Sequence, residues 1–286
     1  MRATSAAARC KSPLECNAVQ LAAEHDIPVT WVGGLPLAAI DRDQSAKLML
    51  EIAISRRGAG GPPPVITSAN GQVLSMCARD SKLRDLFVAT DLIHADGTSL
   101  VFASRLRSSH ALPERVATTD LFHDVAARAE SAGASFYLLG AAPDVIESAV
   151  QRVRARYSGL RIAGYRNGYF SGAQEDSVLA DINAARPDVL WVGMGVPAEQ
   201  EFCLRNRARL TGVGLIKTSG GLFDFVSGKN RRAPGWMQAV GLEWLYRMAL
   251  EPRRLAYRYL TTNPHALYLL LTASGPPGDR AMSQKI

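Results

Sequence analysis

The sequence predicts an α/β protein, in which a mostly parallel β-sheet carries helices on both faces and a basic helical appendage follows at the C-terminal end. Short apolar runs alternate with helical patterns of about 10 to 15 residues, which is typical of βαβ units. Near residue 229 this alternation gives way to helical patterns alone, rich in Arg, Trp and Tyr. With 286 residues, 47% of them hydrophobic and 21% charged, the chain has enough apolar material for a large core.

The first 25 residues are rich in Ala, Ser and Arg, and we expect a flexible segment there. They contain no apolar stretch of the kind found in a secretory signal. No apolar run in the chain approaches the roughly 18 residues that a membrane-spanning helix needs. The four cysteines are scattered, without a C-x-x-C pair, which fits a reducing compartment. We therefore expect a soluble cytoplasmic protein.

Residues 26–228 form the predicted α/β domain. Its helical patterns and its strands alternate along the chain, and in such sheets ligands bind at the carboxyl ends of the strands. Amphipathic helices are predicted at 43–57, 119–132, 144–157 and 174–185. Strands are predicted at 65–66, 92–93, 136–139, 189–192 and 213–216, with a weaker one at 160–162. Polar or glycine residues follow these strands at 67–71, 94–98, 140, 193–195 and 217–221.

Asp96 is the most informative of these residues, because it follows an apolar strand and precedes Gly97 and Thr98. A carboxylate at the carboxyl end of a strand is well placed to act as a general base. It could equally serve as the N-cap of the next helix. The neighbouring His94 is more typical of a packed side chain than of a functional one.

The residues Gly193-x-Gly195-x-x-Ala198 match the dinucleotide-binding pattern only weakly. Pro197 lies inside the pattern, and the acidic residue that would hold a ribose is missing at 214–219, which disfavours a nucleotide-dependent oxidoreductase. Phosphate binding at this turn stays an alternative, because the turn precedes a predicted helix and its backbone N–H groups could approach a phosphate. The sequence has no P-loop, which excludes a P-loop NTPase, and no G-x-S-x-G elbow. Its five histidines show no metal-ligand spacing. We expect no cofactor.

The net charge of +7 is concentrated in the predicted appendage, residues 229–286, which carries +6, whereas residues 1–228 carry +1. Such a block indicates a polyanionic partner: nucleic acid, phosphate or an anionic membrane surface. Trp and Tyr are interleaved with its arginines and favour a membrane interface. They could also pack between helices, with the arginines solvated. No RNA-binding module pattern accompanies them, so we do not expect a nucleic-acid partner.

Several sequence blocks occur together in one order: Asn70, then Asp96-Gly97, RVATTDLF (115–122), YLLGAAPDV (137–145), GYRNGYF (164–170), PDVLWVGMGVP (187–197), GGLFDFVSG (220–228), RRAPGWMQAVGLEWLYR (231–247) and EPRRLAYRYL (251–260). In this order, over about residues 27–265, the chain resembles the WecG/TagA/CpsF glycosyltransferases.

The resemblance implies transfer of a sugar from a UDP-sugar to a polyprenyl-diphosphate-linked saccharide during cell-surface polysaccharide synthesis. It implies inversion at the anomeric carbon, no metal, and a peripheral position on the inner face of the cell membrane, in contact with its anionic surface. The donated sugar, the acceptor and the oligomeric state are left undecided.

Site residues follow from the same resemblance. Asp96 corresponds to the catalytic base. Substrate-binding residues implied by the matching blocks are Ser68, Asn70, Arg115, Gln200, Gly220, Gly221 and Asp224. The appendage arginines implied to meet the diphosphate or the membrane are Arg231, Arg232, Arg247, Arg253, Arg254 and Arg258.

Three positions depart from the family pattern. Thr118 replaces a glycine, and Ser68 replaces a threonine but keeps its hydroxyl. The segment 197–201 is one residue longer than the usual P-K-Q-E, so Gln200 takes the glutamine role, with Glu199 as the alternative. We expect these changes to affect sugar specificity more than the type of reaction.

Overall fold

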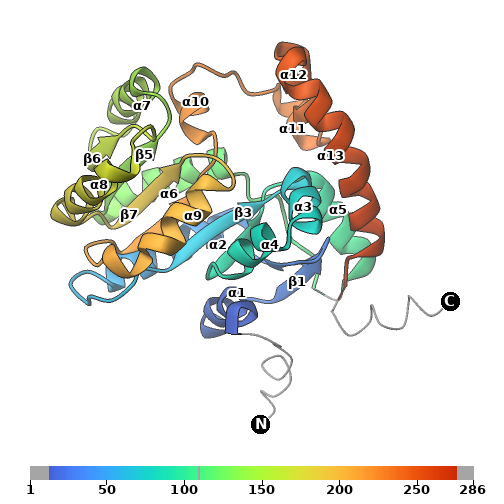
Figure 1. Cartoon of the computed structure of the whole chain (residues 1–286), viewed down its shortest axis with the longest axis horizontal. Helices are drawn as coiled ribbons and strands as arrows, with labels where there is room; N and C mark the ends of the chain where they lie inside the picture. Colours follow the sequence, from blue (N-terminus) through green and yellow to red (C-terminus); the bar gives the residue numbers. More distant parts are fainter. Residues whose placement is uncertain (1–12, 109, 276–286) are drawn as a thin grey trace, which may run out of the picture.

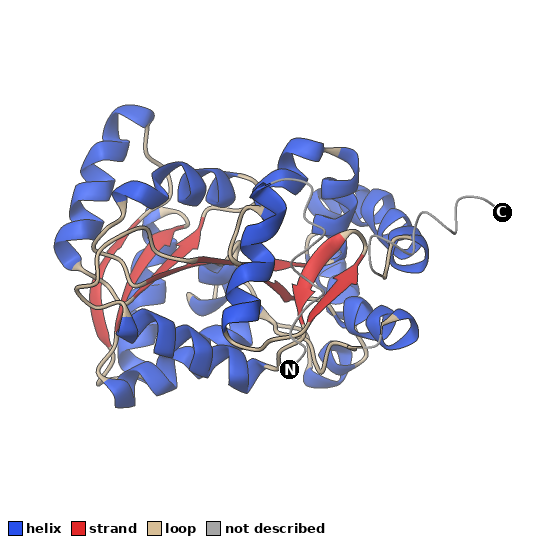
Figure 2. Ribbon diagram, turned by 90° about the horizontal axis from the view of Figure 1, so that it is seen from below, coloured by secondary structure: helices blue, strands red, loops and turns tan. Residues whose placement is uncertain are grey.

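The computed structural model describes residues 13–108 and 110–275, which form a six-stranded sheet with helices around it (Figures 1 and 2). All strand pairs of this sheet are parallel, in the order β4-β3-β8-β7-β5-β6, which confirms the predicted α/β, Rossmann-like class. The strands are β3 (Val65–Ala69), β4 (Leu92–Ala95), β5 (Ser135–Gly140), β6 (Arg161–Arg166), β7 (Val189–Gly193) and β8 (Leu215–Thr218).

The central strands were predictable because helices cover both of their faces, so nearly every side chain is apolar. In β5, Phe136 and Leu138 pack into one hydrophobic cluster and Tyr137 and Leu139 into another, as the two-residue period of a strand requires. Trp191 of β7 is fully buried. The first cluster includes α2 (Arg42–Ser55), α6 (Thr118–Ala132) and α7 (Pro143–Arg156), and the second includes α8 (Gly172–Ala185) and α9 (Ala198–Asn206).

A third cluster lies beside β3 and β4 and includes elements that the sequence pattern did not separate. Among them is an antiparallel hairpin joined by Gly33 and Gly34, which both have positive φ and so suit a two-residue turn. The elements around this cluster are α1 (Pro13–Glu24), β1 (Val29–Val32), β2 (Leu35–Ala38), α3 (Gly71–Arg79), α4 (Ser81–Val88) and α5 (Thr98–Arg107).

The N-terminal segment differs from the expected flexible stretch. Residues 13–24 form α1, whose Ala18 and Ala22 are buried, because small apolar side chains on one face of a helix can pack closely against neighbouring elements. An Ala-rich segment therefore has a packed helical part here. Residues 1–12 of that prediction lie outside the described residues.

Beyond β8 the described chain is helical, as predicted, and its longest helix packs along α3 (Figure 1). Ala266 of α13 lies so close to Gly71 of α3 that a Cβ atom added to Gly71 would be 3.3 Å from the Ala266 Cβ. Leu269 and Leu270 of α13 belong to the third cluster. No helix within the described residues is both long enough and apolar enough to cross a membrane. The helices are α10 (Leu222–Val226), α11 (Gly235–Ala239), α12 (Glu243–Leu250) and α13 (Pro252–Thr272), and a short 3-10 helix, η2 (Arg207–Arg209), follows α9.

Candidate active site

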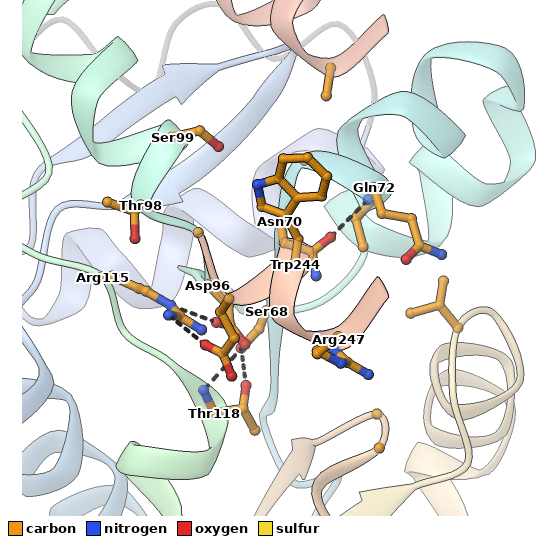
Figure 3. A pocket seen from close by; sticks show the side chains of 18 of the residues that line it. Ser68, Asn70, Gln72, Asp96, Thr98, Ser99, Arg115, Thr118, Trp244 and Arg247 are labelled. Atoms are coloured by element: carbon orange, nitrogen blue, oxygen red, sulfur yellow. Dashed lines mark hydrogen bonds and ion pairs between the residues drawn. The ribbon is translucent and has the colours of Figure 1, made fainter. Parts of the chain in front are cut away.

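A cavity of about 460 Å³ opens at the carboxyl ends of β3, β4 and β8 (Figure 3). One wall comes from the turns after these strands, as the sequence predicts. The opposite wall comes from α12 and α13, through Trp244, Arg247, Arg258 and Tyr259. The cavity therefore lies between the α/β sheet and the basic appendage.

The helices α3, α5 and α6 begin at the sheet side of this cavity. The Oδ1 atom of Asn70 accepts a hydrogen bond of 3.1 Å from the Val73 N–H and caps α3. Gly97 and Ala117, which precede α5 and α6, provide no side-chain cap. The free N–H groups of helix N-termini carry partial positive charge, so this wall favours an anionic ligand.

Asp96 lies in the middle of this wall, with its side chain 22% exposed (Figure 3). One carboxylate oxygen accepts a hydrogen bond of 3.2 Å from the Thr118 N–H at the start of α6, and the other is 3.4 Å from Arg115 Nε. The N-cap position of α5 belongs to Gly97, so the capping interpretation does not hold for that helix. Asp96 instead caps α6 while facing the cavity.

Arg115 connects Asp96 to the appendage. Its Nη1 atom lies 2.9 Å from Glu243 of α12, whose side chain is 13% exposed. Glu243 also pairs with Arg232 at 2.9 Å, and Arg232 reaches Asp120 of α6 at 3.0 Å. This ion-pair cluster holds the appendage against the α/β sheet.

Glu199 occupies the place that the sequence pattern left open for a phosphate. Its Oε2 accepts N–H hydrogen bonds from Met194, Gly195 and Gly220, at 3.3, 3.1 and 2.8 Å. Burial raises the pKa of this carboxyl group. Because the carboxylate already accepts from these amides, the turn after β7 does not present them to a phosphate.

Gln200 and Glu199 were the two alternatives for the family's glutamine role. Gln200 is fully buried and donates a hydrogen bond of 3.1 Å to Thr67 Oγ1, behind the cavity wall. Glu199 lines the cavity and Gln200 does not. Of the two alternatives, Glu199 is therefore the one that lines the cavity.

Ser68 lies beside Asp96 (Figure 3). It receives hydrogen bonds from two side chains. One comes from Thr118 Oγ1 at 3.1 Å, and the other comes from Lys217 Nζ at 2.8 Å. Lys217 is fully buried in β8, and burial lowers its pKa to about 8. Lys217 was not among the predicted site residues, although a cation directly after the apolar run 213–216 was a signal for it.

The structure separates the other predicted residues into two groups. Those that line the cavity are Ser68, Asn70, Asp96, Arg115, Gly220, Gly221, Arg247 and Arg258. Those whose side chains lie elsewhere are Gln200, Asp224, Arg231, Arg232 and Arg253. The side chain of Arg254 is outside the described part of the structure.

The residues outside the cavity have other surroundings. Asp224 lies 3.7 Å from Lys229, and Arg231 and Arg253 are exposed to solvent. Arg232 is engaged in the ion pairs with Asp120 and Glu243.

His94 is fully buried, as its packed interpretation predicts, and neither ring nitrogen has a hydrogen-bond partner among the described residues. Burial lowers its pKa well below the usual value, which favours the neutral ring. The described residues also contain no cluster of His, Cys, Asp and Glu suited to a metal ion.

The chain matches the model of the Glycosyl transferase WecG/TagA/CpsF family over residues 30–277. It is also similar to N-acetylglucosaminyldiphosphoundecaprenol N-acetyl-beta-D-mannosaminyltransferase of Bacillus subtilis (strain 168). The two are 33% identical over 207 residues, which cover 72% of this chain and 78% of the relative. The family match spans the sheet, the cavity and the appendage. The chain is therefore a glycosyltransferase that belongs to the WecG/TagA/CpsF family.

Proposed function

We propose that this glycosyltransferase moves a sugar from a UDP-sugar to a polyprenyl-diphosphate-linked saccharide, with inversion and with Asp96 as the base. The observation that supports this most is the position of Asp96. Its carboxylate faces a cavity that is also lined by arginines and by the N-termini of α3, α5 and α6. The name of the Bacillus subtilis relative points to a lipid-linked N-acetylglucosamine acceptor and to N-acetylmannosamine as the first sugar to test.

The reaction is a single displacement. Asp96 takes the proton of the acceptor hydroxyl as that oxygen forms a bond to the anomeric carbon of the donor sugar. The bond between this carbon and the diphosphate oxygen breaks on the opposite side, so UDP leaves and the anomeric configuration inverts. One carboxylate acting as a base is sufficient for this chemistry.

The leaving UDP requires positive charge close to its diphosphate. Arg247 and Arg258 of the appendage line the cavity, opposite the N-termini of α5 and α6. Fixed cations and helix N-termini stabilise developing negative charge in a site largely shielded from water. This charge supports a transfer that needs no metal ion.

The proposed membrane contact lies on α13, on the cytoplasmic side of the membrane. Tyr257, Leu260, Leu267 and Leu271 are 80%, 71%, 58% and 50% exposed and follow one another at spacings of three, seven and four residues, which places them along one stripe of the helix. Leu267 also lines the cavity. Arg253, also exposed, begins this stripe. Apolar and aromatic side chains next to a cation suit the interface of an anionic membrane.

The decisive experiment incubates the purified protein with a panel of UDP-sugars and a synthetic polyprenyl-diphosphate N-acetylglucosamine. We expect UDP release together with a disaccharide lipid whose new linkage is inverted relative to the donor, as read by NMR. Chelation with EDTA should leave the rate unchanged. A retained linkage would contradict the single displacement, and a loss of activity that Mg²⁺ restores would contradict metal-free transfer.

A further inference from the structure

Lys217 is a buried cation close to the cavity, and the proposed reaction so far gives it no role. Its side chain is fully buried in β8, and its ammonium donates to Ser68 Oγ at 2.8 Å and to the Thr218 carbonyl oxygen at 2.9 Å. Burying an ammonium group costs free energy unless it is well partnered. The rest of β8 is equally buried, so packing alone would favour an apolar side chain here.

The hydrogen bonds to Ser68 determine where its own proton points. A serine hydroxyl has two acceptor positions and one donor proton. Lys217 Nζ and Thr118 Oγ1 both donate to Ser68 Oγ, so both acceptor positions are used. The remaining proton has to point to another partner, and Ser68 lines the cavity.

We propose that Lys217 is a positioning residue, which fixes the Ser68 hydroxyl as a hydrogen-bond donor to a diphosphate oxygen of the nucleotide-sugar. The ammonium does not touch the substrate. It acts through the Ser68 hydroxyl, whose O–H bond it polarises, so that the hydroxyl becomes a stronger donor in the cavity. This inference rests on the proposed function for the identity of the ligand as a nucleoside diphosphate.

A diphosphate oxygen fits this hydroxyl better than a neutral sugar oxygen does. A cation that donates to a hydroxyl oxygen polarises its O–H bond and strengthens the hydrogen bond that the hydroxyl donates onward. Such a donor is most effective toward an anionic acceptor. Ser68 also lies beside the N-terminus of α6, through Thr118, where negative charge is favoured.

The charged state of Lys217 depends on the groups that face it. Burial disfavours the ammonium form and lowers the pKa of Lys217 to about 8, although the nearby carboxylates of Glu199 and Asp96 favour that form. His94 lies in β4, on the other side of β3 from β8, and its pKa is lowered by burial and also by the positive charge of Lys217. Lys217 therefore loses its charge within an experimentally accessible pH range.

The test is a double-mutant cycle that measures UDP binding by calorimetry in Lys217→Met, Ser68→Ala and the double variant. We expect each single variant to bind UDP about tenfold more weakly, because each loses the effect of one hydrogen bond to a charged group. In the Ser68→Ala background, Lys217→Met should add less than about twofold, because both act on one contact. Ser68→Thr, which keeps the hydroxyl, should restore most of the affinity.

Thr67→Val is the matched control, because Thr67 lies next to Ser68 in β3 and makes buried hydrogen bonds without lining the cavity. We expect it to leave UDP affinity unchanged. Additive effects of the Lys217 and Ser68 variants would overturn the proposal, as would a folded Lys217→Met protein that binds UDP normally.

A second measurement does not require Lys217→Met to fold. Between pH 7 and about pH 9, the UDP affinity of the wild type should fall as Lys217 loses its proton, and this fall should be absent in Ser68→Ala. Equal pH dependence in both proteins would overturn the proposal, and so would a wild type that does not bind UDP. If UDP binds with the expected pattern but no sugar is transferred, the proposed reaction fails while the role of Lys217 holds.

Discussion

Asp96 is the residue whose removal should separate chemistry from binding. In Asp96→Asn the amide oxygen can still accept the hydrogen bond from Thr118 N–H, but the side chain cannot take a proton. We expect kcat to fall about a thousandfold, within the range for loss of a general base, while thermal stability and UDP affinity change little.

Asp181→Asn is the control for Asp96→Asn, because Asp181 is an exposed carboxylate on α8 that pairs with Arg166. It should transfer sugar at the wild-type rate. Near-normal turnover in Asp96→Asn would mean that another group accepts the proton.

Glu199 should matter for stability before it matters for catalysis. Its Oε2 accepts N–H hydrogen bonds from Met194, Gly195 and Gly220, which joins the turns after β7 and β8. Glu199→Gln weakens this acceptor and places amide hydrogens beside backbone N–H groups, so we expect a loss of about 2 kcal/mol in the free energy of unfolding. Chemical denaturation measures it, and Glu201→Gln, at an exposed neighbouring position, should be nearly neutral. Equal stability of the two variants would contradict this role.

At the level of single residues, sequence reasoning located the cavity but not the direction of each side chain. The strand-end rule correctly brought Ser68, Asp96 and Gly220 to one edge of the sheet. It could not tell that Gln200 turns away from the cavity while Glu199 turns toward it, because adjacent residues of a helix point in different directions. The register of α9 against the sheet decides between them.

Among the elements, strands covered on both faces were predictable and small elements at the sheet edge were not. The run of β7 is apolar at every position, so its sequence alone identifies it. The β1–β2 hairpin has only four residues in each strand, too few for a clear alternation. Its Gly33-Gly34 turn was the available signal.

The appendage docks through ion pairs that its basic composition did not reveal. Arg232, 22% exposed, contacts Glu243 and Asp120, and Glu243 in turn contacts Arg115 beside Asp96. Arg232→Ala leaves two carboxylates without this partner in a partly buried site, so we expect a loss of about 3 kcal/mol in the free energy of unfolding. Cleavage by trypsin after Lys229 or Arg231, in the segment before α11, should become faster.

Lys229→Ala is the matched control for this docking prediction. Lys229 lies 3.7 Å from Asp224 with 59% of its side chain exposed, and exposed pairs of this kind contribute less than about 1 kcal/mol. Unfolding of this variant should resemble that of the wild type. If Arg232→Ala is as stable as Lys229→Ala, the ion-pair cluster does not hold the appendage in place.

In the whole molecule, the arginines of the appendage lie in several different surroundings, which the net charge of the appendage does not distinguish. The +6 of residues 229–286 predicts a polyanionic partner but not which arginine meets it. The structure places Arg247 and Arg258 at the cavity and Arg232 in the docking cluster. Arg231 and Arg253 are left exposed to solvent. Only contacts between distant segments make this division, so no local pattern could have predicted it.

These exposed arginines lead to a prediction for the proposed membrane contact. Arg231→Glu combined with Arg253→Glu should reduce binding to vesicles that contain anionic lipid by more than tenfold, because each charge near such a surface contributes about 1 kcal/mol. Flotation measures the bound fraction, and rising salt should reduce wild-type binding too. The control is Arg205→Glu with Arg209→Glu, the same charge change on α9 and η2, away from the appendage (Figure 1). If both double variants float equally, net charge alone attracts the protein. If both float like the wild type, the apolar stripe of α13 is sufficient for binding.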